Sequence, residues 1–110
     1  MHTNFSTNEM RDADTGAAAI ETSISRLEAK HKEHITHYGA GLEDRLTGQH
    51  ETSTIHEFSA GAANRGSSIR IPGPVALKGY GYIEDRRPGA NADPYMVAAL
   101  IMSTICDIKM

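Results

Sequence analysis

The feature that most constrains the fold is a segment near the end of the chain that is apolar on nearly every side. Asp93 followed by Pro94 marks a helix start, because an aspartate side chain caps the first amides and proline suits the first turn. The side chains of residues 94–106 are then almost all apolar. A helix without a polar face has no side to turn toward water, so we expect this one to be buried.

A longer helix is expected to begin at residues 14–16 and to end at the glycines at positions 39 and 41. Between these points, apolar or ring-bearing side chains recur at steps of three or four residues, which is the spacing of one helix face. This stripe consists of Ile20, Ile24, Leu27, His31, Ile35 and Tyr38. The stripe also needs a surface to pack against.

The remaining segments favour short strands joined by loops. Residues 67–71 alternate as a strand does and stop at Pro72, residues 72–74 predict a turn, and residues 79–85 carry side chains favoured in sheets. Residues 39–66 resemble a loop. We therefore predict an α+β fold. Because a two-stranded pair is marginal in water and cannot cover both helices, we expect packing surface from outside this chain.

The composition excludes several classes of protein. The only cysteine, Cys106, rules out an internal disulfide and fits a reducing compartment. The first ten residues lack an apolar signal core, and the longest apolar run, residues 95–102, is far shorter than the roughly 20 residues of a membrane span. A net charge of −3 gives no indication of nucleic-acid binding. We predict a cytoplasmic protein with no membrane and no nucleic acid among its partners.

A basic segment with glycine-rich turns carries the strongest functional signal. Residues 45–87 contain six basic and four acidic side chains, although the whole chain is acidic. Five of the basic residues are arginines, whose forks bind phosphate or carboxylate oxygens, and carboxylates suit the hard cation that accompanies nucleotide phosphates. The pattern predicts a site for a polyanion and a metal ion, and a merely basic surface is the alternative.

Six ordered motifs extend over nearly the whole chain. They are residues 2–6 (HTNFS), 45–48 (RLTG), 50–52 (HET), 63–66 (ANRG), 68–72 (SIRIP) and 84–88 (EDRRP). In this order and spacing the chain resembles glutamine synthetase, and residues 58–61 and 68–72 are similar to its eukaryotic type. The resemblance implies that residues 1–110 form the C-terminal portion of the catalytic domain, with antiparallel strands of a partial barrel packed against helices. The small N-terminal domain and the first half of the catalytic domain would be absent.

The resemblance also implies a reaction and its partners. A glutamine synthetase phosphorylates the side-chain carboxylate of L-glutamate with ATP, and ammonia then displaces phosphate from γ-glutamyl phosphate to give L-glutamine. The implied cofactor is Mg²⁺ or Mn²⁺, with ATP as co-substrate. The complete form would be a homo-oligomer of stacked rings.

The resemblance assigns roles to individual residues. The implied metal ligands are His2 and Glu84. The implied ATP-binding residues are Asn4, Phe5, Ser6, Arg65, Arg70, Tyr82, Ile83 and Glu84. The implied glutamate-binding residues are Arg45, Glu51, Arg65 and Arg86. The implied catalytic residues are Glu51, on a flap that closes over the site, together with Arg65 and Arg45.

Simpler explanations exist for these residues when each is taken alone. His2 can be a mobile terminal residue, Glu84 a strand-end glutamate paired with an arginine, and Glu51 an exposed acid in a loop. Cys106, in an apolar helix, is expected to be inert.

Three further histidines invite a different metal hypothesis. His31, His34 and His37 follow one another at three-residue steps along the expected helix. They lie in or beside the apolar stripe, however, so surface or half-buried packing is favoured over a metal site.

Two hypotheses of different classes remain for the function. In the first, the chain is part of a glutamate–ammonia ligase and is inactive alone. In the second, it is a non-catalytic, truncated paralogue that binds or modulates synthetase subunits. The presence of Glu51 and Arg86 favours the first. A small phosphate- or nucleic-acid-binding domain is weakly supported, because no aromatic platform lies among the arginines.

Overall fold

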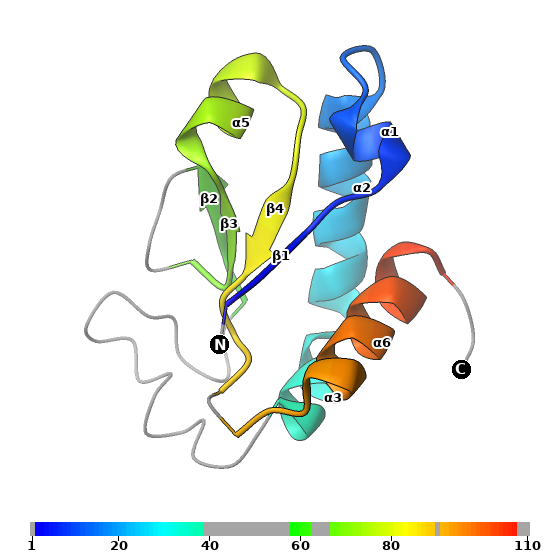
Figure 1. Cartoon of the computed structure of the whole chain (residues 1–110), viewed down its shortest axis with the longest axis vertical. Helices are drawn as coiled ribbons and strands as arrows, with labels where there is room; N and C mark the ends of the chain where they lie inside the picture. The colour runs from blue at the N-terminus through cyan, green and yellow to red at the C-terminus, as the bar shows by residue number, and fades with distance from the viewer. Residues whose placement is uncertain (1, 39–57, 63–66, 90, 108–110) are drawn as a thin grey trace.

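A computed structural model of the chain describes residues 2–38, 58–62, 67–89 and 91–107, and it shows a sheet on one side of a layer of helices (Figure 1). The elements are β1 (Thr3–Phe5), α1 (Asn8–Arg11), α2 (Gly16–Ala29), α3 (His31–His37), β2 (Ala60–Ala62), β3 (Ile69–Ile71), α5 (Gly73–Lys78), β4 (Ile83–Asp85) and α6 (Pro94–Ile105). Apolar side chains of both layers form one core. The predicted α+β class is confirmed.

The sheet has four strands in the order β1-β4-β3-β2. β4 pairs antiparallel with β1 and with β3, as the resemblance implies, whereas β2 and β3 are parallel. Strands β1 and β2 were not predicted, because three residues are too few to show the alternation of a strand. The observed β3 and β4 are also shorter than the predicted segments.

The expected long helix is two helices, and the prediction of one continuous helix was wrong. The break falls at Lys30, whose N–H reaches both Arg26 O and Leu27 O at 3.3 Å. Neither proline nor glycine marks this position, so the break comes from tertiary packing rather than from a local signal. Leu27 before the break and Tyr38 after α3 are both buried, so the apolar stripe still faces the core.

Helix α6 is confirmed at its predicted position. The Asp93 side chain accepts a hydrogen bond from the Tyr95 N–H at 2.9 Å, as expected for an N-cap. Burial on all sides was a wrong expectation, because Tyr95 is 86% exposed and Met102 is 58% exposed. Val97 and Leu100 are buried and lie on the face of α6 that packs into the core. None of the helices in the described ranges is both long and apolar enough to cross a bilayer.

The predicted turn at residues 72–74 instead begins the short helix α5. Proline is tolerated there because the first turn of a helix does not use its N–H groups for internal hydrogen bonds. The helix ends at Lys78 and is capped by Gly79, which has a φ of 88° and whose N–H donates to Val75 O at 2.8 Å. Glycine adopts this left-handed conformation without the strain that a side chain would add.

We expect Gly16→Ala to lower the free energy of unfolding by about 1–3 kcal/mol, because the Cβ of the new alanine would overlap neighbouring atoms. Gly16 begins α2 where Tyr80 crosses it, and a Cβ there would clash with the Tyr80 Cβ and lie 2.7 Å from Met10 O. The matched control is Gly79→Ala, which meets no atom within 4 Å and adds only backbone strain. Urea denaturation of both variants checks the prediction, and an equal or smaller loss for Gly16→Ala would contradict it.

Candidate functional site

Three of the predicted site residues lie side by side on one face of the sheet. In the strand register, Asn4 of β1 is opposite Glu84 of β4, and Glu84 is opposite Arg70 of β3. Directly opposed residues project from the same face of a sheet. Their neighbours Ile83 and Asp85 project from the other face and are buried. The outer face therefore brings together an amide, a carboxylate and a guanidinium from three separate motifs.

Glu84 lies at the centre of this group and has cationic or potentially cationic neighbours. Its Oε1 is 3.1 Å from Arg86 Nε and 3.8 Å from His2 Nδ1, and its side chain is only 16% exposed. Within the described residues, no donor is aligned to give Oε1 a hydrogen bond. A buried carboxylate oxygen without a hydrogen bond is costly, and a divalent cation would satisfy it.

His2 and Glu84 fit a divalent cation as two of its ligands. An imidazole nitrogen and a carboxylate oxygen suit Mn²⁺ or Mg²⁺, whereas a structural zinc site needs more nitrogen or sulfur ligands. The described part of the chain contains no group of three or more potential ligands. Further ligands would have to come from outside these residues.

Arg70 and Arg86 are the guanidinium groups at the outer face. Among the described residues, the buried Nε of Arg70 has no hydrogen-bond partner. An unsatisfied buried guanidinium nitrogen favours an anionic acceptor such as a phosphate or carboxylate oxygen. The backbone N–H of Arg86 donates to Ser68 O at 2.9 Å, which ties the end of β4 to the segment before β3.

The other predicted residues are placed differently. Phe5 and Ile83 are opposite each other in the register, and both pack with the core. Any nucleotide contact from these two residues would have to involve their backbone. Ser6 Oγ accepts a hydrogen bond from Arg11 Nε at 2.7 Å. Tyr82 lines a pocket of about 230 Å³ to which Arg11 also contributes. The predicted Arg45, Glu51 and Arg65 lie outside the described residues.

Sequence reasoning missed a buried ion pair on the opposite side of β4. Arg87 Nε and Nη2 donate to Asp85 Oδ1 and Oδ2, both at 2.9 Å, and the Arg87 N–H donates to Oδ1 at 3.1 Å. Both side chains are at most 1% exposed. Burial raises the pKa of Asp85, but the charge and hydrogen bonds of Arg87 outweigh it and leave the pKa below its usual value. Burial lowers the pKa of Arg87, and the charge of Asp85 more than reverses this effect.

A chain of hydrogen bonds extends this pair toward α6. The Tyr38 hydroxyl donates to Asp85 Oδ2 at 2.8 Å, so its oxygen is available to accept from His34 Nδ1 at 2.7 Å. His34 Nε2 then accepts from the Thr104 hydroxyl at 2.7 Å. Burial, followed by the charge of Arg87, lowers the pKa of His34 to about 4, so the ring is neutral near pH 7. Burial and the charge of Asp85 raise the pKa of Tyr38.

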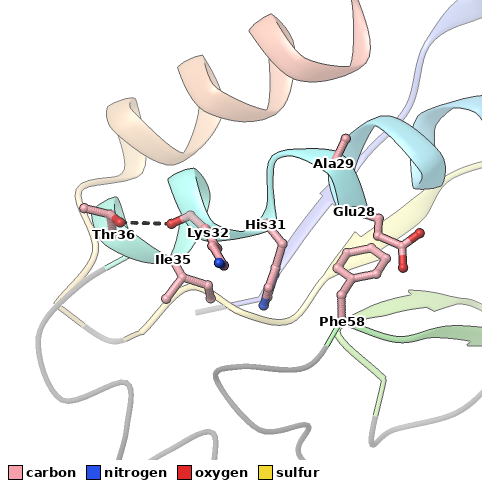
Figure 2. Close-up of a pocket in the computed structure, with 7 residues that line it drawn as sticks. All are labelled: Glu28, Ala29, His31, Lys32, Ile35, Thr36 and Phe58. Atoms are coloured by element: carbon pink, nitrogen blue, oxygen red, sulfur yellow. Dashed lines mark hydrogen bonds between the residues drawn. The ribbon is translucent and has the colours of Figure 1, made fainter.

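The network also reaches a surface pocket. Arg87 Nη1 donates to His31 Nδ1 at 2.8 Å, and the His31 ring meets Phe58 edge to face at a centroid distance of 5.5 Å. Figure 2 shows both rings at a pocket of about 730 Å³. Its lining residues are Glu28, Ala29, His31, Lys32, Ile35, Thr36 and Phe58. None of these is a predicted site residue. His31 and His34 are both buried, more deeply than the predicted surface or half-buried packing.

Sequence comparison finds glutamine synthetases among the relatives of this chain. It is 58% identical to the glutamine synthetase of Colletotrichum gloeosporioides over 105 residues, which make up 96% of this chain and 29% of the relative. It is 58% identical to that of Neurospora crassa over 104 residues, or 94% of this chain and 28% of the relative. It is 60% identical to the chloroplastic glutamine synthetase of Chlamydomonas reinhardtii, over 94% of this chain and 27% of the relative.

These comparisons confirm the predicted resemblance along almost the entire chain. The chain spans less than a third of the length of these curated relatives. No protein-family profile matches it.

Proposed function

We infer that this chain, a homologue of glutamine synthetase, contributes part of the active site of an ATP-dependent glutamate–ammonia ligase. In this proposal, residues 1–110 correspond to the C-terminal portion of the catalytic domain. The single observation that carries the proposal is the convergence of three motif segments on one sheet face, where Glu84 lies opposite both Asn4 and Arg70. A shared surface position is what a common substrate site requires of motifs far apart in sequence.

The outer face offers separate groups for the metal and the anions. His2 and Glu84 would hold Mg²⁺ or Mn²⁺, which when bound would neutralise charge on the ATP phosphates. Arg70, with Arg65, would bind the phosphates, and Asn4 and Ser6 would contact the nucleotide. These residues hold and orient the anions while the phosphoryl group is transferred.

Three other residues would bind the substrate glutamate and assist the second step of the proposed reaction. Arg86 and Arg45 would orient the substrate carboxylates through bidentate contacts. Glu51 would shield γ-glutamyl phosphate from water and take a proton from the incoming ammonium. Ammonia would then displace phosphate and give glutamine.

The proposal requires polypeptide beyond this chain. Two metal ligands are too few for tight binding of a hard cation, so upstream carboxylates would complete the site. The exposed apolar side chains of Tyr95 and Met102 on α6 also favour the presence of further polypeptide that packs against this helix. We propose that the complete protein is a cytoplasmic homo-oligomer of stacked rings.

We expect His2→Ala and Glu84→Gln each to raise the Kd for Mn²⁺ by about tenfold or more, because each removes a proposed ligand. Titration of the purified protein followed by electron paramagnetic resonance measures the free Mn²⁺. The matched controls are His37→Ala and Glu33→Gln, which change the same residue types at exposed positions of α3. Equal Mn²⁺ affinity in the wild type and both site variants would contradict the metal assignment.

The native size of the protein separates the two hypotheses about its activity. An antibody against residues 67–89 would detect a product several times heavier than 11.9 kDa if the chain is part of a ligase. A native product of 11.9 kDa that co-purifies with a longer synthetase would favour the non-catalytic paralogue. Glutamine formation by the purified 110-residue chain would overturn the proposal that it is inactive alone.

A further inference from the structure

The end of β4 alternates between the candidate site and the buried ion pair. Glu84 and Arg86 form an ion pair at 3.1 Å on the outer side, whereas Asp85 and Arg87 form theirs within the protein. The two pairs share one short stretch of backbone. The direction in which Glu84 and Arg86 project is therefore tied to the position of Asp85 and Arg87.

We propose that the Asp85–Arg87 pair, held by Tyr38, positions Glu84 and Arg86 for the metal and anion site. This inference rests on the proposed function, since it assigns to the buried side of β4 the task of orienting the site on its outer side. Asp85, Arg87 and Tyr38 are positioning residues, because none of them lies on the face that would meet substrate.

The backbone needs such support where the sheet ends. The pairing of β4 with β1 and β3 stops at Asp85, and the Arg86 N–H makes one further hydrogen bond to Ser68 O. Beyond this point, the side chain of Asp85 accepts a hydrogen bond from the Arg87 N–H at 3.1 Å, which fixes the backbone just after the strand.

Tyr38 holds the same segment at two places. Its hydroxyl donates to Asp85 Oδ2 at 2.8 Å, and its backbone oxygen accepts from the Gly89 N–H at 2.8 Å. Its hydroxyl is itself fixed by His34, which is fixed by Thr104 of α6. The segment after β4 is therefore connected to both α3 and α6, and a fully hydrogen-bonded buried network of this kind specifies one geometry.

The test uses two variants of different severity and one control. Tyr38→Phe removes the hydrogen bond to Asp85 but keeps the aromatic ring. Asp85→Asn removes the negative charge that pairs with Arg87. Arg26→Gln is the control, because the hydrogen bond that it removes, from Arg26 Nη1 to Ile105 O at 2.6 Å, joins α2 to α6 rather than to β4. All proteins are measured at their native length and well below their melting temperatures.

Two readouts separate positioning from general stability. For Tyr38→Phe we expect amide hydrogen exchange in a peptide containing residues 84–87 to accelerate about fivefold, as the loss of one hydrogen bond predicts. We expect the Kd for Mn²⁺ to rise about tenfold, and further in Asp85→Asn. Arg26→Gln should lower the melting temperature but leave both readouts unchanged. If Tyr38→Phe lowers the melting temperature without changing exchange at residues 84–87, the pair is merely structural and the proposal is overturned.

The exchange readout keeps this inference separate from the proposed function. If Glu84→Gln does not change Mn²⁺ binding, the metal assignment fails. Faster exchange at residues 84–87 in Tyr38→Phe would still support positioning by the network, and unchanged exchange would refute it.

Discussion

Arg87→Met should lower the free energy of unfolding by about 3–5 kcal/mol, because it leaves the carboxylate of Asp85 buried without its counter-charge. Methionine retains much of the volume of the arginine stem, so the loss reports mainly on charge and hydrogen bonding. Arg87 also lies over the Tyr38 and Phe58 rings at 5.2 and 5.5 Å, and these contacts are lost too. Urea denaturation followed by circular dichroism and tyrosine fluorescence measures the change.

An exposed ion pair provides the control for this variant. Lys30 and Glu33 are 3.8 Å apart in helical i,i+3 spacing, with more than half of each side chain exposed. Water and salt screen such a pair, so Glu33→Gln should cost at most about 1 kcal/mol.

A double-variant cycle tests whether the effect belongs to the pair. Asp85→Asn combined with Arg87→Met should cost clearly less than the sum of the single variants, because the double variant leaves no unpaired buried charge. Strictly additive losses would show that the two residues contribute independently, and would contradict the ion-pair explanation.

The helices show how far periodicity alone predicts this fold. The Asp93 cap and the apolar run after it are local signals, and α6 begins and ends close to the predicted positions. The break at Lys30 has no such signal in the sequence. Helix–helix packing decides it, and α2 and α3 both contact α6. A pattern confined to one helix cannot report a contact with a segment some 70 residues away.

The sequence predicts which residues belong to the outer face of the site, but not how they are arranged in space. The motifs identified Asn4, Arg70 and Glu84, yet nothing within any one motif indicates that all three lie in one register across β1, β4 and β3. Strands of three residues are too short for the alternation that would predict their pairing. The register follows from tertiary packing of the apolar side chains on the inner face.

The buried ion pair could have been found from the sequence by a different argument. Ile83 is expected to face the core of a strand, and alternation then carries Asp85 and Arg87 to the same side. Charged side chains are so seldom buried that a short alternating segment does not by itself predict their burial. The sequence does not indicate that Tyr38 is the hydrogen-bond partner of Asp85, because Tyr38 is 47 residues away in the chain.

Acidification from pH 6.5 to pH 4 should remove about 3 kcal/mol of stability through His34 alone. Its pKa falls from 6.5 in the unfolded chain to about 4 in the folded protein, so the unfolded state binds the proton more readily in this window. The stabilising effect is complete above pH 6.5 and is lost as the pH falls to the folded value. Asp85 acts at lower pH, because its lowered pKa keeps it ionised in the folded state below its usual value of 3.8.

The matched variant for this measurement is His34→Gln, whose amide donates and accepts hydrogen bonds but does not titrate. It should be less stable than the wild type at pH 7 and should lose less stability between pH 6.5 and pH 4. The charged groups that act on His34 are Arg87, Asp85, His31 and His37, and all of them remain in the variant. Urea midpoints at several pH values give the difference. If both proteins lose stability in parallel, protonation of His34 does not cause the loss, and another titrating group must be responsible.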